Sequence, residues 1–79
     1  MTNMMKVICI SNTSICTSNK MPLDIGQTYF IDRSSIYLDS DGDAFGIVHN
    51  AIVDDEQPKD VRPGTIVGNL ALKHFQSII

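Results

Sequence analysis

Tryptophan is absent from the sequence, and the 79 residues include only two tyrosines and three phenylalanines. Modules that recognise proline-rich peptides use grooves lined with aromatic rings, so this scarcity argues against that mode of binding. Long hydrophobic runs are missing too: the longest, Val7–Ile10, has four residues, whereas a membrane helix needs roughly 20. The N-terminal residues lack the pattern of a signal peptide. We therefore expect a soluble, cytoplasmic protein.

Clustered basic residues are also lacking. Six Lys and Arg are scattered singly along the chain and are outnumbered by nine Asp and Glu, which gives a net charge of −3. Binding to a phosphate backbone requires grouped Lys or Arg, so the composition disfavours ordinary nucleic-acid binding. Cysteine is equally sparse. Cys9 and Cys16 match neither a C-x-x-C redox motif nor a zinc knuckle, and we expect two free thiols.

The chain does contain enough apolar residues for a small globular fold. A hydrophobic fraction of 43% with 19% charged residues is ordinary for a folded protein. A chain this short buries only roughly 60% of its unfolded surface, so its core is one layer thick. We expect residues 1–79 to form a single domain.

The first half of the chain reads as two strands joined by a polar loop. Residues 4–10 are β-branched and sulfur-rich, and residues 27–32 are rich in strand formers. Between them, Ser11–Asp24 is dominated by Ser, Thr and Asn, whose side chains compete for backbone hydrogen bonds. We expect a long irregular loop there, anchored by Ile15 and Leu23.

The strongest local signal is a hairpin around Asp41-Gly42, the dipeptide that two-residue type I′ turns prefer. With that turn, large apolar side chains fall on one face, and an aromatic ring covers a strand glycine on the other. The predicted pairs are Ser40 with Asp43, Leu38 with Phe45, Ile36 with Ile47, and Tyr37 with Gly46.

The second half is predicted more loosely. The strand after the turn continues to Ile52–Val53, and a charged loop with two prolines follows over 54–64. Residues 65–67 are strand-like, and residues 69–75 have an N-cap candidate but room for only a short helical turn. The apolar residues 77–79 are expected to add a final strand to the sheet.

The order of these elements, with Lys6–Ile10, the motif Leu23-x-x-Gly26-x-x-Tyr29 and Phe75 near the end, resembles the small SH3-like β-barrel proteins of bacteriophages and prophages. The resemblance covers about two thirds of the chain. It implies a mainly β fold, a small five-stranded antiparallel barrel with one short helical turn near the C-terminus, in which the Asp41-Gly42 hairpin is the distal hairpin. The fallback is a general small mixed β fold. The chain departs from the pattern at the insertion from Asp54 to Gly64.

Motifs for metal binding are incomplete. Asp39, Asp41 and Asp43 occupy the first, third and fifth places of an EF-hand loop, but Ala44 stands where its glycine belongs and Asn50 where its glutamate belongs. A solvated acidic turn is the simpler interpretation.

Other site chemistry is missing as well. The histidines, His49 and His74, have no zinc-ligand spacing to the cysteines. The chain has no G-x-S-x-G elbow and no phosphate loop. We predict no metal, no cofactor, no catalytic residue and no enzyme activity.

The acidic residues supply the leading functional hypothesis. They fall in two loops that together form a negative face suited to a basic partner. The members are Asp39, Asp41, Asp43, Asp54, Asp55, Glu56 and Asp60. With the resemblance, this predicts a non-enzymatic protein-binding module, a phage or prophage accessory protein that binds and modulates, by inhibition, a host protein in the host cytoplasm. Solubility alone accounts for the same charges.

Two alternatives stay open. One is a nucleic-acid-associated small barrel, for which Tyr29 and Tyr37 flanking Arg33 form the only aromatic and basic group. The other is a self-associating structural protein, suggested by the apolar termini. The sequence is compatible with a monomer or a small homo-oligomer.

Overall fold

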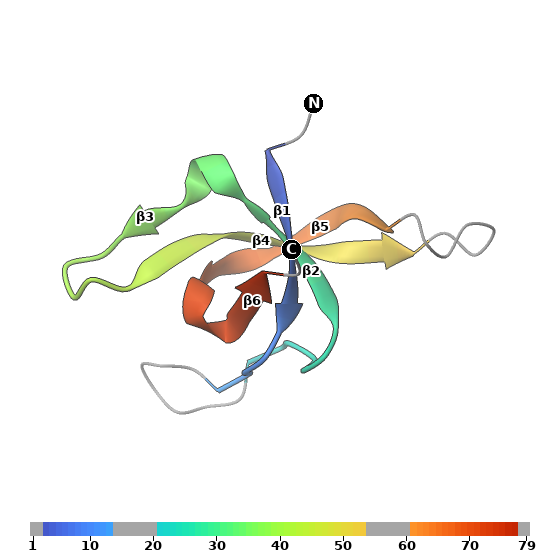
Figure 1. The fold of residues 1–79 in the computed structure, drawn as a ribbon, viewed down its shortest axis with the longest axis horizontal. Helices are drawn as coiled ribbons and strands as arrows, with labels where there is room; N and C mark the ends of the chain where they lie inside the picture. The colour runs from blue at the N-terminus through green and yellow to red at the C-terminus, as the bar shows by residue number, and fades with distance from the viewer. Residues whose placement is uncertain (1–2, 14–20, 54–60, 78–79) are drawn as a thin grey trace.

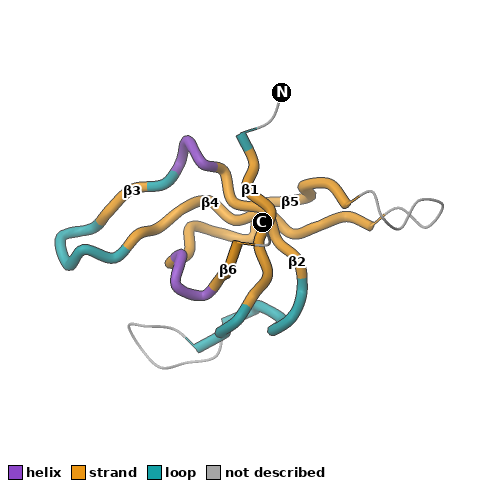
Figure 2. The backbone as a smooth tube through the Cα atoms, viewed as in Figure 1, coloured by secondary structure: helices purple, strands orange, loops and turns teal. Residues whose placement is uncertain are grey.

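The structure, a computed structural model, describes residues 3–13, 21–53 and 61–77. In these residues six strands and two 3-10 helices follow one another along the chain (Figure 1). They are β1 (Met4–Cys9), β2 (Thr28–Asp32), η1 (Arg33–Ser35), β3 (Tyr37–Leu38), β4 (Ala44–Val53), β5 (Val61–Ala71), η2 (Leu72–His74) and β6 (Phe75–Ser77). The tube in Figure 2 shows that strands predominate and that helix is confined to short turns.

All strands pair antiparallel in a single sheet. The order β3-β4-β2-β1-β6 describes one path, and β5 pairs with the other edge of β4. The first strand therefore contacts both the second and the last strand. In Figure 1, β1 runs across the direction of β4 and β5, which shows how strongly the sheet curls into half a barrel. Such curling lets a small sheet enclose its own core.

The core lies on the concave side of this sheet. Its central members come from β1, the segment before β2, β2, β4 and β6, and β5 adds partly buried side chains: the central ones are Val7, Cys9, Leu23, Tyr29, Ile31, Val48 and Phe75. The Tyr29 and Phe75 rings meet edge to face, with centroids 5.7 Å apart, a favoured aromatic geometry. Leu23 is buried as predicted, whereas its proposed companion Ile15 lies outside the described residues.

These features confirm the expected fold class. The fold is mainly β, and its sheet is barrel-like. It has five strands of three or more residues, the two-residue strand β3 and a short helical turn before the last strand. The connectivity is that of a small SH3-like barrel. One assignment inside it was wrong: the hairpin that leads into the helical turn is β4–β5, not the hairpin around Asp41-Gly42. The segment with η1, β3 and the Asp41-Gly42 turn is instead an insertion between β2 and β4.

The predicted register of the β3–β4 hairpin is wrong by one residue. Tyr37 pairs with Phe45 and Leu38 with Ala44, so Tyr37 does not face Gly46 and Leu38 does not face Phe45. The cause is a three-residue loop in place of the two-residue turn. Gly42, at φ 84°, is the last residue of that loop, and a left-handed glycine is typical of this position.

The strand β5 is much longer than the predicted segment 65–67. It includes Pro63 and Gly64, which the sequence placed in a loop. Proline is tolerated because, within the described residues, β5 pairs with β4 alone, and an edge strand has one side without ladder hydrogen bonds. The pairing is interrupted by register shifts beside His49, where Asn50 occupies the space that a Cβ on Gly64 would need.

The C-terminal elements follow the prediction with shifted boundaries. The helical turn is the 3-10 helix η2, whose N-cap is Ala71 with no side-chain cap, so the expected N-cap at Asn69 was wrong. The last strand begins at Phe75 and pairs with β1, two residues earlier than predicted. The end of the predicted strand, 78–79, lies outside the described residues.

Candidate functional site

The β3–β4 hairpin, residues 36–45, presents both apolar and acidic side chains to solvent. Its turn is built by Asp39. The Asp39 carboxylate Oδ1 accepts hydrogen bonds from the backbone N–H groups of Asp41 and Asp43, each at 2.9 Å. The Gly42 N–H donates to the Asp39 carbonyl at 3.1 Å and the Asp39 N–H to the Asp43 carbonyl at 2.9 Å. The Asp39 side chain therefore fixes the conformation of this loop.

A short network holds the hairpin against the sheet. The Ser35 hydroxyl donates to the Asp32 carbonyl at 2.6 Å and accepts from the Ile47 N–H at 2.7 Å. The Asp32 carboxylate caps η1 by accepting from the Ser34 hydroxyl and the Ser34 N–H. These hydrogen bonds lower the pKa of Asp32, and the bond from the Ser34 hydroxyl has the larger effect. The hairpin thus leaves the barrel from a defined root.

Three consecutive apolar side chains on the hairpin are exposed: Ile36, Tyr37 and Leu38. Leu38 is 70% exposed and Tyr37 is 48% exposed. The Tyr37 ring is nevertheless fixed, because it stacks on Phe45 at 5.8 Å and its hydroxyl accepts from the Asn69 amide at 2.9 Å. An exposed apolar segment rimmed by polar groups is typical of an interaction surface.

The backbone of Leu38 also points to the open edge of the sheet. Hydrogen-bonded and non-hydrogen-bonded pairs alternate along an antiparallel ladder. Asp39 and Asp43 form a hydrogen-bonded pair, so the next pair, Leu38 and Ala44, is a non-hydrogen-bonded pair. The N–H and C=O groups of Leu38 therefore face away from β4. In the sheet order, β3 is a terminal strand.

The acids of the turn differ in their surroundings. Asp43 forms an ion pair with Lys73 at 3.5 Å, and one oxygen of Asp39 is occupied by backbone amides. No described residue pairs with the Asp41 carboxylate, which is exposed. Three members of the predicted acidic face, Asp39, Asp41 and Asp43, therefore lie at the tip of the hairpin, beside the exposed apolar segment. The other predicted members, Asp54, Asp55, Glu56 and Asp60, lie outside the described residues.

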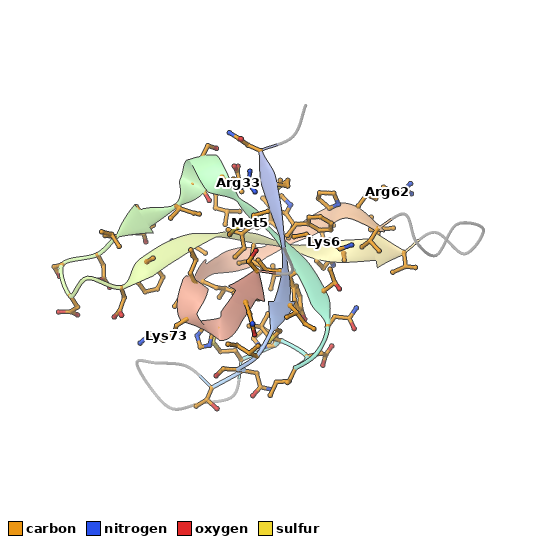
Figure 3. All side chains as sticks on the ribbon, in the orientation of Figure 1. Met5, Lys6, Arg33, Arg62 and Lys73 are labelled. Carbon is orange, nitrogen blue, oxygen red and sulfur yellow. The ribbon has the colours of Figure 1, made fainter. Side chains whose placement is uncertain are left out.

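The aromatic and basic group proposed for nucleic acid is not assembled. Tyr29 is a core residue, and its hydroxyl accepts from the Asp24 N–H at 3.0 Å. Only Tyr37 and Arg33 are exposed. Figure 3 shows that the labelled basic side chains come from different elements, with Arg62 and Lys73 on opposite sides of the view. Tyr29 is thus unavailable for stacking on a base.

The candidate metal ligands are occupied or apart. The Cys9 thiol is buried and donates to the Ser11 carbonyl at 3.3 Å, and His49 Nδ1 lies 3.0 Å from the Gly64 carbonyl oxygen. His74 is buried, and Cys16 lies outside the described residues. Among the residues that the structure describes, no three His, Cys, Asp or Glu side chains gather as metal ligands would.

No helix within the described ranges has the length and apolar character needed to cross a bilayer. Comparison with protein-family models, curated proteins and solved structures found no match to this chain. Its function must therefore be argued from the fold and from the geometry given above.

Sequence reasoning identified the acids of the hairpin but missed the apolar segment beside them. The incorrect register placed Ile36 and Leu38 on one face of the hairpin with Phe45 and Ile47. The signal that could have corrected it is Asp39, since Asp at the first position of a turn and Gly at the fourth favour a four-residue turn from 39 to 42.

Proposed function

We propose that this chain is a non-enzymatic protein-binding module of the phage and prophage accessory type, which binds a host protein and inhibits it. The contact is the β3–β4 hairpin. The observation that carries the proposal is the exposed apolar segment at Ile36, Tyr37 and Leu38, next to the acidic turn. Its place of action in this proposal is the host cytoplasm.

The two parts of the hairpin have different roles in binding. Burying the Leu38 side chain in a partner contributes roughly 1.5–3 kcal/mol, so the apolar segment supplies affinity. Charges at the rim contribute less to affinity, but they raise the association rate and orient the partner. The fitting partner surface is an apolar pocket bordered by Lys or Arg.

The rigidity of the hairpin supports this role. Tyr37 is fixed by Phe45 and Asn69, and the turn is fixed by Asp39. A side chain that is already ordered loses less conformational entropy on binding. The hairpin is therefore suited to enter a partner surface without rearranging.

The test is capture of proteins from bacterial lysate by the tagged chain, with and without nuclease, followed by mass spectrometry. We expect one dominant protein to survive nuclease treatment and to be lost from the Leu38→Ser and Asp41→Lys variants. Retention that disappears with nuclease contradicts the proposal and supports the nucleic-acid alternative.

A matched control is available in Ile25, which is 62% exposed and distant in sequence from the hairpin. The Ile25→Ser variant removes a comparable exposed apolar side chain, and we expect it to capture the same protein as the unmodified chain. Equal loss from the Ile25→Ser and Leu38→Ser variants would remove the hairpin as the contact. Size-exclusion mass measurement of each variant shows whether self-association contributes.

A further inference from the structure

A second candidate binding site lies away from the hairpin, since no hairpin residue is among the described residues that line it. A hollow of about 400 Å³ opens between the segment preceding β2 and the central parts of β4 and β5. This volume lies within the range of roughly 300–1,000 Å³ that small ligands occupy. Its walls divide into a polar group and an apolar group.

The polar group consists of Asp24, Gln27 and Asn50. The backbone of Asp24 is held at both ends, because its N–H donates to the Tyr29 hydroxyl at 3.0 Å and its carbonyl accepts from the Gln27 N–H at 3.1 Å. Its carboxylate has no hydrogen-bond or ion-pair partner among the described residues. Asn50 donates from its amide nitrogen to the Thr65 hydroxyl at 3.1 Å, and its side-chain oxygen lies against Gly64, so Asn50 forms a fixed wall of the hollow.

The apolar group consists of Pro22, Tyr29, Ala51 and Val67. Tyr29 is a member of the core, and Val67 packs against it, so these two walls are supported from behind. Apolar walls suit the methylene stem of a long charged side chain, which buries its stem while its head group stays polar.

We propose that the hollow binds the arginine side chain of a peptide or protein ligand. Among the described residues of the lining, Asp24 is the only charged one, so it favours a cation. The two carboxylate oxygens of Asp24 and the side-chain oxygen of Gln27 suit a guanidinium, which presents five N–H donors in a planar fork, better than the compact ammonium of lysine. The site stands apart from the hairpin, so it goes beyond the proposed function and can hold or fail independently.

The experiment is a titration of the isotopically labelled full chain with N-acetyl-argininamide, followed by amide NMR shifts. The matched ligand is N-acetyl-citrullinamide, which has the same stem and size but no charge. We expect saturable shifts at Gln27 and Asn50 with the arginine probe and at least severalfold weaker binding of citrulline. Loss of one charged hydrogen bond makes the Asp24→Asn variant bind arginine about tenfold more weakly.

Two further variants keep the result decisive. Asp32→Asn removes an acid that lies outside the hairpin and outside the described lining of the hollow, and its amide oxygen can still accept at the η1 cap, so we expect it to leave the arginine affinity unchanged. Gln27→Glu adds a carboxylate to the rim, and we expect tighter binding of arginine even if Asp24→Asn were to perturb the fold. Shifts that do not saturate, equal binding of citrulline, or equal effects of the Asp24 and Asp32 variants would overturn the proposal.

Discussion

The turn of the β3–β4 hairpin gives the sharpest prediction about stability. Replacing Asp39 by alanine removes two hydrogen bonds to backbone N–H groups, each 2.9 Å long. A net contribution of about 0.5–1.5 kcal/mol per bond, reduced where water can reach the freed amides, gives a loss of about 1–2 kcal/mol in the free energy of unfolding. Asparagine keeps an acceptor oxygen, so Asp39→Asn should cost about half as much.

The neighbouring acid provides the control. Asp41 accepts no hydrogen bond from a described residue, so Asp41→Ala should change the free energy of unfolding by less than about 0.5 kcal/mol. Gly42 has φ 84° and open space where a Cβ would lie, so Gly42→Ala should cost about 1 kcal/mol through the backbone alone. Urea unfolding followed by circular dichroism measures all four variants. Equal stability of the Asp39→Ala and Asp41→Ala variants would refute this account of the turn.

Three other features give separate predictions. Burial lowers the pKa of His74, and the charge of Lys73 acts in the same direction. Because the unfolded chain then binds the proton more readily than the folded chain, the free energy of unfolding should fall as the pH drops below about 6.5. Urea unfolding of the His74→Phe variant should show a flatter pH dependence. A Cβ on Gly46 would lie 3.0–3.3 Å from three apolar side chains, whereas one on Gly68 would meet only an ordinary contact at 3.8 Å, so Gly46→Ala should cost about 1–3 kcal/mol in thermal unfolding and Gly68→Ala close to nothing. The exposed Lys73–Asp43 pair, at 3.5 Å, should contribute less than about 1 kcal/mol, and a larger loss on Lys73→Ala in a double-mutant cycle would contradict this.

The strands were predictable because their signals are local. The β-branched run around Val7 and Ile8 and the aromatic run around Tyr29 and Phe30 mark β1 and β2 to within a residue or two. The 3-10 turn before β6 was also predictable, because helix formers there have too little length for more. These elements decide the fold class.

The hairpin register and the length of β5 depend on hydrogen bonds and strand pairing that local sequence patterns do not reveal. The register depends on a hydrogen bond that the Asp43 N–H donates to the Asp39 carboxylate, in a stretch where Asp41-Gly42 equally favours a different turn. Pro63 is accepted in β5 only because that strand pairs on one side. Tyr29 shows the limit for the site itself, since nothing in its sequence neighbours distinguishes a core tyrosine from one that stacks on a base.

The central claim is that the β3–β4 hairpin is a protein-binding element, and a binding isotherm tests it most directly. The measurement is the affinity of the purified captured protein for the unmodified chain, for Leu38→Ser and for Ile25→Ser. Burial of Leu38 predicts a loss of about 10- to 100-fold for Leu38→Ser, with little change for Ile25→Ser. Equal affinity of the unmodified chain and Leu38→Ser would contradict the claim.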